Sequence, residues 1–241
     1  MKDFRNAFTF MADHAGLLWS KTVEHLALSG AAIGVALAIA VPLGMWLGHL
    51  HRGSFVANNI ANIGRALPSL AMISIGLAIL GLGFANVMVA LVVLAVPPIL
   101  TNAYTSVAGV DPEAVGAARG MGMRPREVFR SVELPLALPL LFAGIRTASV
   151  YVVATATLAA IAGGGGLGDI IVNQASYGLS GVVAASIWVA ALALLVDLGL
   201  GTVQHLLTPR GLRRRVPVLG PPDRGTRHDP RLEPAPGAAP R

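Results

Sequence analysis

Apolar residues gather into five long segments along the chain, and polar residues fall mainly between them. The segments lie at residues 26–47, 66–84, 85–104, 136–162 and 182–207. Each is close to the ~20 residues that a helix needs to cross the hydrocarbon core of a bilayer. Only Gly81, Gly83 and Asn86 interrupt the second and third segments, which predicts a tight hairpin between them. We therefore expect an all-α polytopic membrane protein with about five transmembrane helices.

The composition agrees with this pattern. Hydrophobic residues make up 54% of the 241 residues and charged residues 12%, with a mean hydropathy of +0.68, whereas an average soluble domain is about one quarter charged. The formal net charge of +6 comes from arginines concentrated in a few polar stretches. We interpret them as topology-setting charges and expect no nucleic-acid partner. The chain has no cysteine, which excludes disulfides and cysteine-ligated metals.

The arginines outside the apolar segments predict an orientation. Arg52 and Arg65 follow the first segment, residues 111–135 contain four arginines, and residues 208–241 contain eight. The turn around Gly83 and residues 163–181 contain no Arg or Lys. Because basic residues favour the cytoplasmic side, we expect a cell-membrane protein whose N-terminus lies outside and whose C-terminus lies in the cytoplasm.

The two ends of the chain differ from the apolar segments. Residues 1–25 mix aromatic and aliphatic side chains with charges, which is typical of an amphipathic helix at a membrane interface, although a loose lead-in remains an alternative. They lack the order of a signal peptide, so we expect them to be retained. Residues 208–241 are rich in Arg, Pro and Gly, which predicts a disordered cytoplasmic tail. The transmembrane domain is thus expected at 26–207.

Residues 111–135 carry the signals of two short helices. Asp111 can cap the first, with Pro112 in its first turn, and the sequence Gly120-Met121-Gly122 can end it. Pro125 is expected to open a second helix that stops before Pro135. Such a compact polar pair either presents a surface to a partner or is an ordered linker.

The same segment resembles the "EAA" loop of permeases in binding-protein-dependent ABC importers. Gly116-Ala117-Ala118, then Gly122, then Val132-Glu133-Leu134-Pro135 match the spacing of that pattern without a gap. The resemblance implies a coupling helix that docks a separate ATPase, with Ala117, Ala118 and Gly122 in close packing and Leu134 and Pro135 at the return into the membrane. Gly116 stands where the family usually has a docking Glu. Glu113, one turn earlier, either substitutes for it or is only a helix-terminus charge.

A longer likeness narrows the family. Residues 65–71, 98–105, 133–139, 144–148 and 164–169 resemble permeases of osmoprotectant importers, which carry glycine betaine, carnitine or choline. The resemblance implies the type I ABC importer permease fold. It also implies three kinds of partner: a pair of ATPase subunits that hold ATP and Mg, a second permease copy or paralogue, and an extracellular substrate-binding protein. No cofactor is expected on this chain. The alternatives are an ABC permease for another small solute, such as methionine or a phosphonate, and an ion-coupled secondary carrier.

Prolines and glycines in the spanning segments mark a possible pathway or gate. Pro68 and Pro98 each lack a backbone N–H donor and can therefore break a spanning helix. Broken helices often line transport pathways, although a simple packing kink is an equal alternative. Gly164, Gly165 and Gly166 suggest a flexible outer gate or turn. Few aromatic residues lie in the spans, so high-affinity recognition of a quaternary amine is better assigned to the binding protein.

Two charged residues lie within spanning segments. Arg146 and Asp197 are expected to face the protein interior, either as a mutual ion pair or with Arg146 bracing the 111–135 segment. The only lysines, Lys2 and Lys21, lie outside any glycine-rich phosphate loop, so no ATPase motif is present. His49 and His51 do not share a helix face and are interpreted as interfacial residues. We expect neither a catalytic residue nor a metal site.

Overall fold

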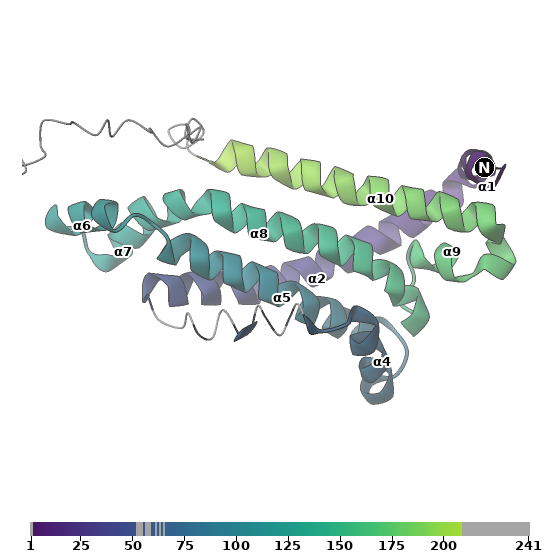
Figure 1. Cartoon of the computed structure of the whole chain (residues 1–241), viewed down its shortest axis with the longest axis horizontal. Helices are drawn as coiled ribbons and strands as arrows, with labels where there is room; N and C mark the ends of the chain where they lie inside the picture. Colours follow the sequence, from purple (N-terminus) through teal and green to yellow (C-terminus); the bar gives the residue numbers. More distant parts are fainter. Residues whose placement is uncertain are drawn as a thin grey trace, which may run out of the picture. The chain divides into compact units, whose positions relative to one another are not determined.

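The computed structural model describes residues 2–51 and 66–208, together with residues 55, 59, 60, 62 and 64 (Figure 1). Contacts divide the chain into residues 1–209 and 210–241, and every described residue belongs to the first part. Arg52, Arg65 and the tail from residue 209 onward lie outside the described residues, so the expected disorder of that tail remains a prediction.

The described residues are mainly helical and no strand occurs among them, which confirms the all-α prediction. A π-helical turn at Phe129–Glu133 precedes α8, and a 3₁₀ segment at Ala156–Ala162 follows it. Figure 1 shows α2, α5, α8 and α10 running lengthwise, with α6 and α7 beyond one end. The helices are α1 (Lys2–Asp13), α2 (Ala15–His49), α4 (Ser69–Leu80), α5 (Phe84–Ala108), α6 (Pro112–Gly120), α7 (Pro125–Val128), α8 (Leu134–Thr155), α9 (Gly168–Val172) and α10 (Gln174–Leu207).

Within the described ranges, four helical segments are long and apolar enough to cross a membrane. They are Ala15–His49, Phe84–Ala108, Pro125–Ala162 and Gln174–Leu207. The predicted span at 66–84 needs correction, because its helix α4 has only 12 residues and an axial length of about 18 Å. Pro68 has an extended backbone and sits immediately before α4, and a turn at Gly81 ends the helix. The predicted tight hairpin between α4 and α5 is confirmed.

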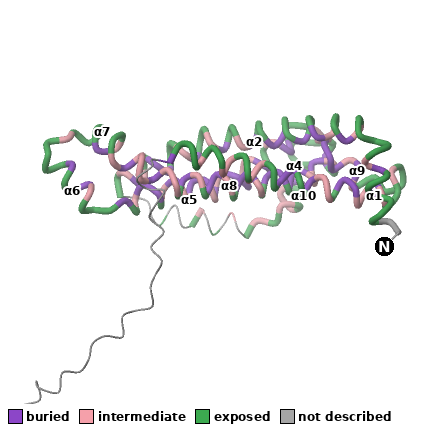
Figure 2. The backbone as a smooth tube through the Cα atoms, turned by 90° about the horizontal axis from the view of Figure 1, so that it is seen from above, coloured by how far each residue is buried: buried purple, intermediate pink, exposed green. Residues whose placement is uncertain are grey.

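Helices α2 and α5 pack closely because small residues line their interface. Ala32, Ala36 and Ala40 of α2 are fully buried, and Gly44 and Gly48 continue the same four-residue spacing. A Cβ at Gly44 would lie 2.7 Å from the backbone oxygen of Leu100. Such stripes allow helix backbones to approach within a membrane. Figure 2 shows the buried residues concentrated between the long helices.

The N-terminal helix α1 packs on α10. Ala7 and Phe10 are buried in a cluster with residues of α10, and the Phe10 ring meets the Tyr177 ring edge-on at 6.4 Å. Phe4 and Phe8 are more than half exposed on α1. Helix α2 already begins at Ala15, so the second half of the 1–25 segment continues directly into the first spanning helix.

Candidate functional site

The 111–135 segment begins with the predicted cap. The Asp111 carboxylate accepts a hydrogen bond of 2.9 Å from the Glu113 backbone N–H, and Pro112 occupies the first turn of α6. Helix α6 ends at Gly120, and Gly122 has a φ of +85°, a left-handed conformation that glycine adopts without strain. The helix start at Asp111 and its end at the glycine pair are therefore confirmed.

This segment has a small core of its own. Val110, Val115, Ala118 and Val128 are buried together, with Met123, Val132 and Leu136 packed against them. Gly116 and Ala117 are exposed on the opposite side of α6, and no atom lies within 4 Å of a Cβ built on Gly116. Met121 at the tip is 73% exposed. The segment thus presents small exposed residues next to an exposed apolar side chain, with the exposed charges of Glu113 and Arg119 beside them.

The C-terminal end of the 111–135 segment differs from the prediction. Pro125 opens α7 as expected, but the helix does not stop before Pro135. It passes through the π-helical turn at Phe129–Glu133 directly into α8. A proline lacks the backbone donor and crowds the preceding turn of an α-helix. The wider π turn just before Pro135 accommodates both effects, and such turns are frequent at functional sites.

A polar contact that the sequence did not reveal fixes the C-terminal end of the 111–135 segment. Glu133 is only 1% exposed, and its Oε2 lies 2.5 Å from Nδ1 of His49, the last residue of α2. The His49 ring also meets the Phe129 ring edge-on at 5.4 Å. The two partners are 84 residues apart in sequence, so no local pattern could have paired them. The contact ties the base of the 111–135 segment to the end of the first spanning helix.

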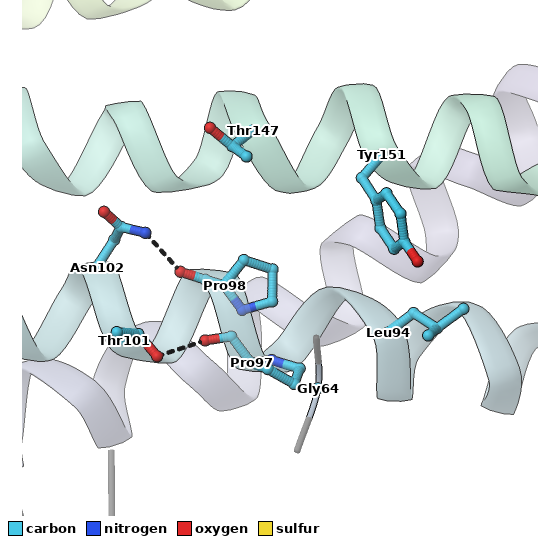
Figure 3. A pocket seen from close by; sticks show the side chains of 8 residues that line it. All are labelled: Gly64, Leu94, Pro97, Pro98, Thr101, Asn102, Thr147 and Tyr151. Atoms are coloured by element: carbon cyan, nitrogen blue, oxygen red, sulfur yellow. Dashed lines mark hydrogen bonds between the residues drawn. The ribbon is translucent and has the colours of Figure 1, made fainter. Parts of the chain in front are cut away.

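A cavity of about 400 Å³ lies between α5 and α8 (Figure 3). Pro98 of the predicted pathway residues lines it, whereas Pro68, Gly164, Gly165 and Gly166 do not lie among its described lining residues. The Thr101 hydroxyl donates to the Pro97 carbonyl (2.9 Å), and the Asn102 amide donates to the Pro98 carbonyl (2.8 Å). The described lining residues are Gly64, Leu94, Pro97, Pro98, Thr101, Asn102, Thr147 and Tyr151.

The glycine loop at 163–166 is attached to α2 near the end opposite α6 and α7. The Gly166 backbone N–H donates to a Glu24 carboxylate oxygen (3.1 Å), and Lys21 bridges Glu24 and Asp169 with two contacts of 2.8 Å. A Cβ on Gly166 would lie 3.0 Å from Nδ1 of the buried His25. The loop is therefore held by ionic contacts, a feature that the sequence alone did not indicate.

The two charged residues in the spans form a bidentate ion pair. Arg146 donates from Nε to Asp197 Oδ1 (2.9 Å) and from Nη2 to Oδ2 (2.7 Å). Gln204 accepts a third hydrogen bond from Arg146 and donates to the Pro139 carbonyl (3.1 Å). Of the two arrangements left open by the sequence, the mutual pair is the one observed. It joins α8 to α10 and does not reach the 111–135 segment.

No group of three potential metal-ligating side chains occurs in the described part of the chain. His49 and His51 are accounted for by other contacts: His49 binds Glu133, and Nδ1 of His51 lies 3.3 Å from the His49 carbonyl oxygen. The α5–α8 cavity, whose described lining carries no charge, is a candidate site for a small solute, and the surface of the 111–135 segment is a candidate site for a protein partner.

Comparisons with known proteins identify the family and the fold of the chain. The sequence profile of the family described as "Binding-protein-dependent transport system inner membrane component" matches residues 40–210. The choline transport system permease protein OpuBB of Bacillus subtilis is 39% identical over 206 residues, which cover 85% of this chain and 95% of that protein. The osmoprotectant import permease protein OsmW of Salmonella typhimurium is 34% identical over 217 residues, or 85% of this chain and 98% of that protein.

A solved structure shares the fold. A chain of the MetNI methionine ABC transporter in an inward-facing conformation superposes with a TM-score of 0.69 at 24% identity. The match covers 82% of this chain and 99% of that chain. At this identity the likeness establishes the type I ABC importer permease fold and carries no information about the solute.

Proposed function

Because the chain belongs to the family of binding-protein-dependent transport system inner membrane components, we propose that it forms the translocation path of an ATP-driven importer for quaternary-amine osmoprotectants. Choline, glycine betaine and carnitine are the candidate solutes. One observation carries the solute class: the likeness to a permease named for choline extends over 95% of that protein's length. A relative named for glycine betaine, carnitine and choline together is 38% identical over 206 residues.

The energy source in this proposal is a separate pair of ATPase subunits that bind ATP and Mg. The only lysines of the chain, Lys2 and Lys21, lie outside any phosphate-binding loop. The exposed residues Gly116, Ala117 and Met121 offer small and apolar contacts to the ATPase. Gly116 lacks the usual docking carboxylate, so the exposed charges that this interface retains include those of Glu113 and of the arginines of the segment.

The remaining partners are a second permease and an extracellular binding protein. The α5–α8 cavity opens on the surface of the single chain, since the Tyr151 that lines it is 42% exposed. A second copy, or a paralogue, would close the cavity into a path. In this arrangement the N-terminus lies outside the cell, and residues 111–135 lie in the cytoplasm, as the arginine distribution favours. The 163–166 loop then faces the binding protein.

Reconstitution tests the proposal. The chain is purified with its cognate ATPase and binding protein, placed in proteoliposomes, and assayed for uptake of radiolabelled choline, glycine betaine and carnitine. We expect uptake that requires both ATP and the binding protein. Uptake driven by an ion gradient without ATP would establish the secondary carrier instead. ATP-dependent uptake of methionine or a phosphonate without any quaternary amine would overturn the solute class.

A further inference from the structure

We propose that the α5–α8 cavity binds the solute in transit, with the Tyr151 ring against the quaternary ammonium group and the Asn102 amide toward the polar end of the same molecule. This assignment rests on the proposed function and deepens it, because it names the residues that distinguish a quaternary amine from other cations. It concerns the permease itself and not the binding protein.

The lining of the cavity suits a cation that forms no hydrogen bonds. None of its described lining residues is charged, and Leu94, Pro97 and Pro98 supply apolar surface. A primary ammonium entering this space would lose hydrogen bonds to water without finding acceptors for all its N–H groups. A quaternary ammonium has no N–H group and loses none. The volume of about 400 Å³ is at the lower end of the ~300–1,000 Å³ typical of small-molecule sites.

Tyr151 supplies the attraction at one end of the cavity. It is the one aromatic residue among the described residues that line the cavity. Figure 3 shows its ring projecting from α8 toward α5, beside Leu94. A cation over the face of an aromatic ring is attracted by the negative charge density of that face, and quaternary ammonium ligands are bound in this way. A single ring gives weak binding, which suits a solute that must leave again.

Asn102 supplies polarity at the other end. One of its amide hydrogens is held by the Pro98 carbonyl, and within the described part of the chain the second hydrogen and the amide oxygen have no partner. Gly144 packs against this side chain so closely that a Cβ there would lie 2.2 Å from the Asn102 Cβ. Asn102 and Leu94 are eight residues apart, about 12 Å along the helix axis. The cavity thus offers a polar and an apolar end, as a betaine or an amino alcohol requires.

The test compares quaternary amines with their tertiary analogues in proteoliposomes that contain the complete transporter and saturating binding protein. Initial uptake rates are measured for choline against dimethylethanolamine and for glycine betaine against dimethylglycine. Tyr151→Leu should lower the quaternary-to-tertiary rate ratio, by at most the ~fivefold of one whole cation–ring contact, because the protonated tertiary amine loses part of the same attraction. Tyr151→Phe should keep the ratio within about twofold because it retains the ring.

Two further variants separate the ends of the cavity. Asn102→Ala should slow a quaternary amine and its tertiary analogue equally and leave their ratio unchanged. Trp46→Leu is the matched control, because Trp46 is an aromatic residue on α2 with 60% exposure that is absent from the described cavity lining. It should leave both rates and their ratio unchanged.

The outcomes distinguish this assignment from the proposed function. Uptake by the wild type with an unchanged ratio in Tyr151→Leu overturns the role of Tyr151, and so does a Phe variant that loses as much as the Leu variant. If Tyr151→Leu fails to assemble, Tyr151→Met removes the ring while keeping an unbranched apolar side chain, and the same criteria apply. A wild-type transporter without ATP-dependent uptake of any quaternary amine overturns the proposed function itself.

Discussion

Replacing His49 by leucine is expected to destabilise the chain because it leaves a buried carboxyl group without its partner. Glu133 is 1% exposed, and its Oε2 lies 2.5 Å from His49 Nδ1. Its Oε1 has no hydrogen-bond partner among the described residues. In His49→Leu, both oxygens would be buried and unpaired.

The size of the effect follows from this geometry. Hydrogen bonds to charged groups contribute about 1.5–3 kcal/mol, and removing one member of a buried ion pair costs about 3–5 kcal/mol. The His49 side chain is 22% exposed, so water can replace part of its contact. We therefore expect about 3 kcal/mol for His49→Leu. Replacing both residues by leucine should cost less than about 1 kcal/mol, since no polar group then remains unpaired.

Thermal unfolding of the purified protein in detergent measures this difference. A change of 1 kcal/mol shifts the Tm of a chain of this size by about 2–4 °C, so His49→Leu should melt about 6–12 °C below the wild type. The double variant His49→Leu/Glu133→Leu should recover most of that loss. His205→Leu, the same substitution at an exposed position of α10, is the control. A His49→Leu variant that melts with the wild type, or a double variant that melts below the single one, would refute the reasoning.

Three other substitutions follow from the local geometry. Gly116→Glu should fold normally, because the space around Gly116 is open. It should raise the apparent affinity for the ATPase in a titration of substrate-stimulated ATP hydrolysis. An unchanged affinity contradicts a docking role for that charge. Gly166→Ala should lower Tm by several degrees more than alanine at an open glycine of α2, since it combines a φ of +84° with a Cβ 3.0 Å from His25 Nδ1. Asp197→Asn should lower Tm because Arg146 loses its carboxylate partner within a spanning helix. The double variant Arg146→Met/Asp197→Leu should restore the Tm. Equal Tm values of the single and double variants contradict a stabilising role of the ion pair.

Local signals in the sequence predicted the long helices and the start of the 111–135 segment. Long apolar segments and the Asp111-Pro112 cap depend on residues near one another in the chain, so pattern alone identifies them. The α4 span was overestimated because a hydropathy window responds to composition, while Pro68 and Gly81 determine where that helix begins and ends. A charged pair between Arg146 and Asp197 could be anticipated because neither residue is stable alone in a membrane.

Contacts between residues far apart in the chain could not be predicted from the sequence. The Glu133–His49 contact joins residues 84 positions apart, and the attachment of Gly166 to Glu24 joins residues 142 apart. The passage of the helix through Pro135 was missed because proline ordinarily ends an α-helix, whereas a preceding π turn removes the conflict. The position of Tyr151 in the cavity could not be predicted from the sequence, because it depends on α5 and α8 lying side by side.

Helix α8 joins the 111–135 segment to the cavity. It starts directly after Glu133 and carries Tyr151 into the cavity 18 residues later, about 27 Å along its axis. The Arg146–Asp197 ion pair joins α8 to α10. If residues 111–135 dock the ATPase as proposed, a displacement of this segment would reach the cavity through α8. Glu133→Gln should thus change the amount of solute carried per ATP, whereas Tyr151→Leu should change which solute is carried. The double variant should show both effects independently, because the two sites are well over 10 Å apart. Altered solute preference in Glu133→Gln alone would show that the π turn reshapes the cavity and does not only transmit motion.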